Sequence, residues 1–101
     1  MPKDYYQTFD EEDITIDNTS GGVGLTSAKV KSNPPPRRIS IFVETAQIRY
    51  TLKPGAAPTS SAGEVLNPFD RLNLENTSEA DNFKAIRTGG TSANIRVKYQ
   101  R

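Results

Sequence analysis

The feature that most constrains this chain is a two-residue alternation of apolar and polar side chains within short stretches. It is clearest over residues 38–44 and recurs over residues 93–99. Successive side chains of a strand point to opposite faces, so such alternation predicts strands with one buried face. In the first stretch the inward positions are Ile39, Ile41 and Val43, which places Phe42 on the opposite face. An apolar row backed by an outward phenylalanine indicates that a partner covers part of the second face.

Turn-forming residues divide the rest of the chain into further short segments, and no segment long enough for a sizeable helix competes with them. The expected strands are residues 14–16, 23–31, 38–44, 47–52, 64–66, 69–74, 83–87 and 93–99. We expect a tight hairpin or a bulge at 45–46, a hairpin across 88–91, and one helical turn at 77–82. Turns every 8 to 12 residues or so are typical of all-β domains. The sequence therefore predicts a single small β-sandwich or jelly roll of about seven or eight short antiparallel strands.

The N-terminal segment differs from the rest in charge and pattern. Residues 1–17 hold six acidic and one basic side chain, a net −5, whereas residues 18–101 hold six acidic and twelve basic side chains, a net +6. Residues 1–12 show no sustained period, so we expect an extended acidic arm at 1–12 followed by a β-sandwich domain at 13–101. Complementary charge would let the arm dock on its own body or on a neighbouring subunit, and a solvated terminus is the simpler alternative.

Composition excludes several kinds of chemistry. The chain has 101 residues, enough for one domain, and contains neither cysteine nor histidine. Disulfides, thiolate nucleophiles, imidazole bases and thiolate or imidazole metal sites are therefore excluded, and assembly in a reducing cytosol fits this composition. No apolar run approaches the roughly 18 residues of a membrane span or resembles a signal peptide, so we expect no membrane contact.

The remaining motifs favour ordinary structural roles. Residues 21–24 are rich in glycine but lack the spacing of a phosphate-binding loop, so they predict a turn. The acidic run at 10–13 lacks the alternate spacing of a calcium loop. Four carboxylates, Glu44, Glu64, Asp70 and Glu75, could supply a glycosidase pair, but nothing selects two of them. We therefore predict no catalytic, cofactor-binding or metal-binding residues and no small-molecule substrate.

Two other binding functions are weakly supported. Arg49, Arg96, Lys98 and Arg101 could contact nucleic acid beside Tyr5 or Tyr6, but a pI of about 8.0 is lower than that of most nucleic-acid-binding domains. A carbohydrate-binding module would need a platform built from tyrosine alone, because the chain has no tryptophan. The two Asn-x-Ser/Thr sequons at 18–20 and 76–78 are explained as coincidence in a Ser/Thr-rich chain.

Several strings resemble a known group of proteins. They are residues 43–51, the step at Pro58-Thr59 with Gly63 and Leu66, residues 82–89, and the alternation Ala93-x-Ile95-x-Val97-x-Tyr99. Over residues 24–100 the chain resembles small β-sandwich virion proteins of tailed bacteriophages, encoded in the head and neck gene region. The resemblance implies a capsid decoration or cement role and brings no catalytic residues with it.

Together these observations predict a non-enzymatic virion structural protein, assembled in the host cytoplasm, with the capsid lattice as its partner. It would bind the major capsid protein or other virion proteins and form a homo-oligomer, with loops 53–63 and 88–91 as peripheral contacts. A tail, neck or baseplate component is the alternative. The predicted interface residues are Tyr5, Tyr6, Phe9, Asp10, Glu11, Glu12, Phe42 and Arg49.

Overall fold

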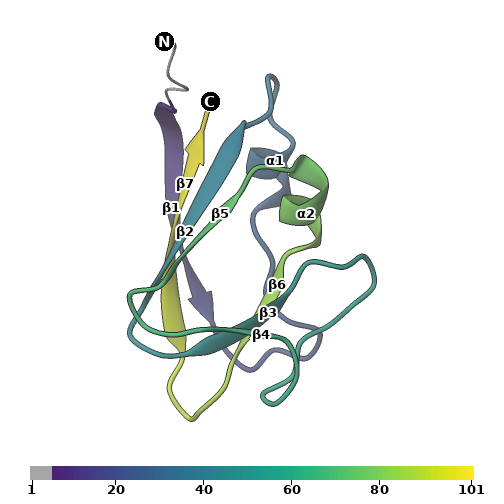
Figure 1. The fold of residues 1–101 in the computed structure, drawn as a ribbon, viewed down its shortest axis with the longest axis vertical. Helices are drawn as coiled ribbons and strands as arrows, with labels where there is room; N and C mark the ends of the chain where they lie inside the picture. Colours follow the sequence, from purple (N-terminus) through teal and green to yellow (C-terminus); the bar gives the residue numbers. More distant parts are fainter. Residues whose placement is uncertain (1–5) are drawn as a thin grey trace.

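The computed structural model describes residues 6–101 as two antiparallel sheets packed face to face (Figure 1). One sheet has four strands in the order β1-β7-β2-β5 and the other has three in the order β4-β3-β6. The strands are β1 (Thr8–Ile16), β2 (Arg38–Glu44), β3 (Ile48–Thr51), β4 (Glu64–Leu66), β5 (Arg71–Leu74), β6 (Lys84–Arg87) and β7 (Ala93–Gln100). The predicted small all-β sandwich is confirmed.

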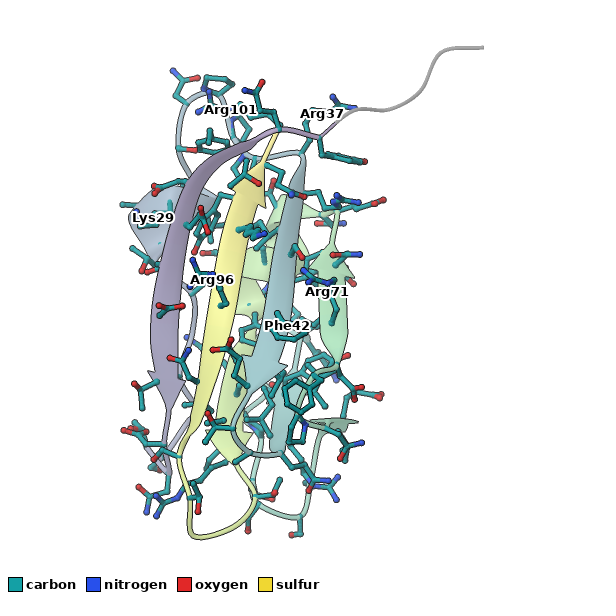
Figure 2. All side chains as sticks on the ribbon, turned by 90° about the vertical axis from the view of Figure 1, so that its left-hand side faces the viewer. Lys29, Arg37, Phe42, Arg71, Arg96 and Arg101 are labelled. Atoms are coloured by element: carbon teal, nitrogen blue, oxygen red, sulfur yellow. The ribbon has the colours of Figure 1, made fainter. Side chains whose placement is uncertain are left out.

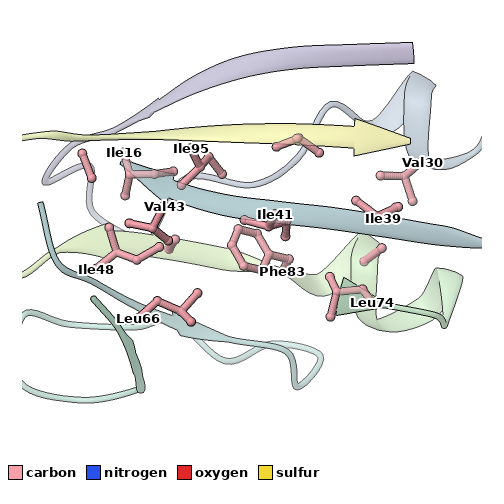
Figure 3. Packing of buried hydrophobic residues seen from close by; sticks show 14 of the residues in the cluster. Ile16, Val30, Ile39, Ile41, Val43, Ile48, Leu66, Leu74, Phe83 and Ile95 are labelled. Atoms are coloured by element: carbon pink, nitrogen blue, oxygen red, sulfur yellow. The ribbon is translucent and has the colours of Figure 1, made fainter. Parts of the chain in front are cut away.

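The core lies between the sheets and is built by the alternation seen in the sequence. On β2 and β7 every second side chain is fully or almost fully buried (Figure 3). The inward residues of these two strands are Ile39, Ile41, Val43, Ala93, Ile95, Val97 and Tyr99. They pack in one cluster with Ile48 of β3 and with Phe83, which immediately precedes β6. The Phe83 ring stacks on that of Tyr50, with the ring centroids 5.7 Å apart. Removal of such surface from water is the main stabilising contribution.

Two short helices lie side by side at the end of the sandwich that the shorter sheet leaves open (Figure 1). They are α1 (Ser27–Val30) and α2 (Thr77–Asn82). Val30 and Ala80 point into the core, and the Lys31 ammonium lies 3.5 Å from the Asp81 carboxylate between the helices. The predicted helical turn at 77–82 is confirmed. Its N-cap is Asn76, whose side chain accepts hydrogen bonds from Ser78 and Glu79 backbone nitrogens, as capping chemistry requires.

Two predicted connections were wrong, and so was one predicted strand. Neither the hairpin or bulge expected at 45–46 nor the hairpin expected at 88–91 is present, because β2 and β3, like β6 and β7, belong to different sheets. Both segments are corners at which the chain crosses the sandwich, and Thr45 takes a φ of 80° at the first of them. Residues 23–31 are not a strand either: Val23 makes one isolated bridge to Ala85 and the chain then enters α1.

The predicted boundary between arm and domain was also wrong. β1 begins at Thr8 and pairs with β7 along its whole length, so residues 8–12 belong to the sheet. The alternation pattern did not indicate a strand over residues 8–12, because Asp10 and Glu12 occupy inward positions that are apolar in other strands. Residues 1–5 lie outside the described part of the chain. Within residues 6–101, no helix is long and apolar enough to cross a membrane.

Candidate functional site

The site with the most unusual surface chemistry is the outer face of the four-stranded sheet, meaning the side chains that point away from the core. Direct cross-strand partners share a face. The register therefore aligns one row across all four strands: Asp13 on β1, Arg96 on β7, Phe42 on β2 and Arg71 on β5. Figure 2 shows Arg96, Phe42 and Arg71 side by side on this face. Phe42 thus has an arginine at the facing position on each neighbouring strand, and the Arg71 guanidinium lies 5.0 Å from its ring centroid.

A second aromatic ring extends this row at the β5 edge. Phe69 immediately precedes β5 and is 76% exposed, with its ring centroid 6.3 Å from that of Phe42. Its φ of 74° lies in the left-handed region, which costs a non-glycine residue about 1–3 kcal/mol. Backbone hydrogen bonds hold the turn: the Phe69 nitrogen donates to the Val43 oxygen at 2.7 Å and the Val43 nitrogen to the Asp70 oxygen at 3.0 Å. A strained turn therefore presents a large apolar ring to solvent.

The turn is held further by side chains that do not touch the rings. The Asp70 carboxylate accepts a hydrogen bond from the Asn67 backbone nitrogen at 2.8 Å, and the Asp70 nitrogen donates to the Asn67 oxygen at 3.0 Å. This closed loop of hydrogen bonds fixes the position of Phe69 without using its ring. The ring is consequently available for contacts outside the chain.

Several basic side chains share the outer face with the aromatic pair. The Arg71 guanidinium donates to the Ser40 hydroxyl at 2.7 Å and lies 5.0 Å from the Phe42 ring centroid. Arg38 donates to the Gln100 side chain at 2.7 Å. Within residues 6–101, Arg38, Arg71 and Lys98 make no salt bridge. Their positive charge is left to solvent or to a partner.

Two acidic side chains of the outer face lie on the opposite edge strand, β1. Glu11 and Asp13 of β1 lie 3.3 and 3.5 Å from the two terminal nitrogens of Arg96. These three side chains are about half exposed, so each pair contributes at most about 1 kcal/mol to folding. The outer face therefore has an acidic column on the β1 edge and the basic Arg71 on the β5 edge. The two central strands carry Arg96, Lys98 and Arg38 with one acid, Glu44, which accepts a hydrogen bond from the Asn94 side chain at 2.9 Å.

The other two acidic residues of β1, Asp10 and Glu12, are partly buried and form hydrogen bonds within the domain. The Asp10 carboxylate lies 2.6 Å from the Lys29 ammonium of α1, and this hydrogen bond lowers the pKa of Asp10 and raises that of Lys29. Glu12 accepts hydrogen bonds from the Thr26 hydroxyl at 2.7 Å and from the buried Tyr99 hydroxyl. Burial, with the Glu12 carboxylate second, raises the pKa of Tyr99 well above its usual value. Of the two docking partners expected for the acidic segment, Asp10 and Glu12 contact the chain's own body, where they hold α1 against the sheet.

The structure separates the other predicted interface residues. Tyr5 lies outside the described residues. The Tyr6 ring lies under the guanidinium of Arg38, at 4.0 Å, and the Phe9 ring lies 3.7 Å from that of Arg101. Arg49 lies on β3 of the other sheet, where its terminal nitrogen donates to the Gly63 oxygen at 2.8 Å. Of the predicted set, Phe42 and Glu11 share the outer face.

Sequence reasoning missed Phe69 and Arg71. Phe69 was expected to lie within a strand, where its side chain would have followed the alternation. Only the left-handed turn places its ring beside that of Phe42. An aspartate in an Asn-Pro-Phe-Asp string is a turn signal that could have suggested this geometry.

A shallow depression of about 620 Å³ lies away from this face, between residues 18–21, 57–60 and 86–89. It brings together part of each loop that was expected to make peripheral contacts. Its lining is Asn18, Ser20, Gly21, Ala57, Pro58, Thr59, Ser60, Ile86, Arg87, Thr88 and Gly89. The lining is mainly small and hydroxyl-bearing, and its cation, Arg87, donates to the Ser92 hydroxyl at 3.2 Å. This pattern offers few groups for orienting a ligand.

Within the part of the chain that the structure describes, no group of three or more acidic side chains is placed to hold a metal ion. No protein-family model, curated protein or solved structure matches the chain.

Proposed function

We propose that this chain is a structural protein of a tailed-phage virion that acts through protein–protein contacts, as a capsid decoration or cement subunit. One observation carries the proposal: the aromatic pair Phe42 and Phe69 on a flat sheet face, flanked on one side by Arg71, which makes no salt bridge within residues 6–101. Aromatic and arginine side chains are enriched at the centres of protein interfaces. The resemblance over residues 24–100 supports the assignment to a virion.

The left-handed conformation of Phe69 strengthens the case for binding. Strained residues persist where surrounding structure holds them, and they are frequent at functional sites. Here the hydrogen-bonded turn keeps the ring 76% exposed rather than turning it toward the core. In the isolated chain an exposed ring contributes little to stability. When a partner covers it, removal of its apolar surface from water contributes favourable free energy to binding.

The test is the protein composition of purified phage particles produced from the genome that carries this gene. Quantitative mass spectrometry should find this chain in a copy number comparable with that of the major capsid protein. A copy number matching a single ring of a few subunits would favour the tail or neck alternative. Absence from the particle would refute the proposal.

A further inference from the structure

We infer that the outer face of the four-stranded sheet is the contact surface between two copies of this chain, related by a two-fold axis parallel to the strands. The inference rests on the proposed function only in taking this face as a protein-binding surface. Four observations carry it: the register of the outward side chains, the division of charge, the position of the aromatic pair, and the area of the face.

The outer faces of two copies are complementary in charge when they are related by one particular two-fold axis. Acidic Glu11 and Asp13 lie on the β1 edge. Arg71 lies on the opposite edge strand, β5, as Figure 2 shows. A two-fold axis parallel to the strands, between β7 and β2, places β1 of one copy over β5 of the other. Asp13 then faces Arg71 of the partner copy, and the symmetry produces this contact twice. An axis across the strands would instead place the acidic column over itself, which is unfavourable.

The same axis brings the aromatic rings to the centre. Phe42 is on β2, one of the two central strands of the order β1-β7-β2-β5, and lies opposite Arg96 on the other. The axis between these strands therefore sets the two copies of Phe42 next to each other, each beneath Arg96 of the partner copy. Each Arg96 already forms salt bridges with Glu11 and Asp13 of its own chain, so its positive charge is partly balanced. Phe69 lies at the rim and reaches over β1 of the partner copy.

The size of the face sets the strength of the dimer. Four strands about 4.8 Å apart, with four rows of outward side chains about 6.8 Å apart, give a face of about 500 Å² per copy. Two such faces bury about 1,000 Å², which is the small end of the range for specific interfaces. Aligned packing of two sheets has this geometry in β-sandwiches. We therefore expect a weak, reversible dimer with a Kd of about 10 to 100 µM.

The experiment is sedimentation equilibrium of the whole chain at concentrations up to about 1 mM, with circular dichroism confirming that each variant is folded. Arg71→Glu and Asp13→Lys should each weaken the dimer by about tenfold, because each creates two repulsive contacts. The double variant should restore the Kd to within about threefold of the original, since the charges are exchanged between facing positions. Lys53→Glu, which makes the same charge change in an exposed loop, is the control and should have no effect.

A second variant keeps the inference testable if charge reversal disturbs the fold. Phe69→Asn removes the ring while supplying a residue that tolerates the left-handed conformation, and it should weaken the dimer about tenfold or more. A monomer at every concentration would overturn the inference, as would a dimer that none of these variants weakens or a double variant that stays dissociated. Monomers that instead bind a poly-dT oligonucleotide less tightly after Arg71→Glu would assign the face to nucleic acid. A monomeric chain found in particles at high copy number would leave the proposed function standing while refuting the dimer.

Discussion

Replacement of Glu12 by alanine should destabilise the domain far more than its place in an acidic run suggests. The Glu12 carboxylate accepts hydrogen bonds from Thr26 and from the Tyr99 hydroxyl, and the Tyr99 side chain is fully buried. Loss of a charge-assisted hydrogen bond costs about 1.5–3 kcal/mol, and the buried hydroxyl is left without this acceptor. We expect Glu12→Ala to lower the free energy of unfolding by about 2–4 kcal/mol, a large share of the 5–15 kcal/mol of a typical domain.

A double-mutant cycle isolates the contact. Tyr99→Phe removes the hydroxyl and should cost about 1–2 kcal/mol, because the half-buried carboxylate can still bind water. The double variant leaves neither group unsatisfied, so its cost should fall short of the sum by about 1–2 kcal/mol. Urea unfolding followed by circular dichroism measures each value, and Glu12→Ala should lower the midpoint by about 1–3 M.

The neighbouring acid supplies the control. Glu11 lies on the outer face and pairs with Arg96 at 3.3 Å in an exposed position, so Glu11→Ala should change the free energy of unfolding by less than about 1 kcal/mol. Equal costs for Glu11→Ala and Glu12→Ala, or strictly additive effects of Glu12→Ala and Tyr99→Phe, would show that no buried acid–tyrosine contact fastens β1.

Three further predictions concern other parts of the fold. Asp10→Asn should remove a stabilising contribution that is present above the ordinary pKa of 3.8 and lost as pH falls through the lowered folded value; acid titrations of the two proteins should therefore differ at neutral pH, approach each other as pH falls below about 4, and converge only below the lowered folded pKa. Deletion of residues 1–12 removes the first half of β1 and should destabilise the domain by more than about 3 kcal/mol by urea unfolding, since several sheet hydrogen bonds are lost at about 1 kcal/mol each. Phe83→Ala should cost about 3–5 kcal/mol, because the ring is fully buried between the sheets; a thermal midpoint within a few degrees of the original would contradict this burial.

The sequence predicts the strands of this protein better than their arrangement. The bounds of β2 match the predicted stretch at 38–44, because apolar alternation reports which side chains are buried. The same alternation carries no information on which strand lies beside which. Both predicted hairpins therefore failed at points where the chain passes from one sheet to the other.

The candidate site was harder to predict for a related reason. The N-terminal part of β1, before the predicted strand at 14–16, was missed because Asp10 and Glu12 point inward. Their hydrogen-bond partners Lys29, Thr26 and Tyr99 lie far from them in the sequence. Hydropathy registers such positions as exposed, since it contains no information on distant hydrogen-bond partners. An inward acid is tolerated only where partners compensate its desolvation, and those partners are set by the tertiary fold.

These two sets of acidic residues explain how one strand serves both stability and binding. On β1 the inward acids hold α1 and Tyr99, whereas the outward acids Glu11 and Asp13 reach Arg96 in exposed pairs that add little to folding. Weak exposed pairs can exchange partners at low cost, whereas the hydrogen bond from the buried Tyr99 hydroxyl to Glu12 cannot. Because alternate residues of a strand face opposite sides of the sheet, the two roles fall on different side chains of β1. Substitutions on its outer face should alter association with little effect on the free energy of unfolding. Substitutions on its inner face should lower the free energy of unfolding with little direct effect on association.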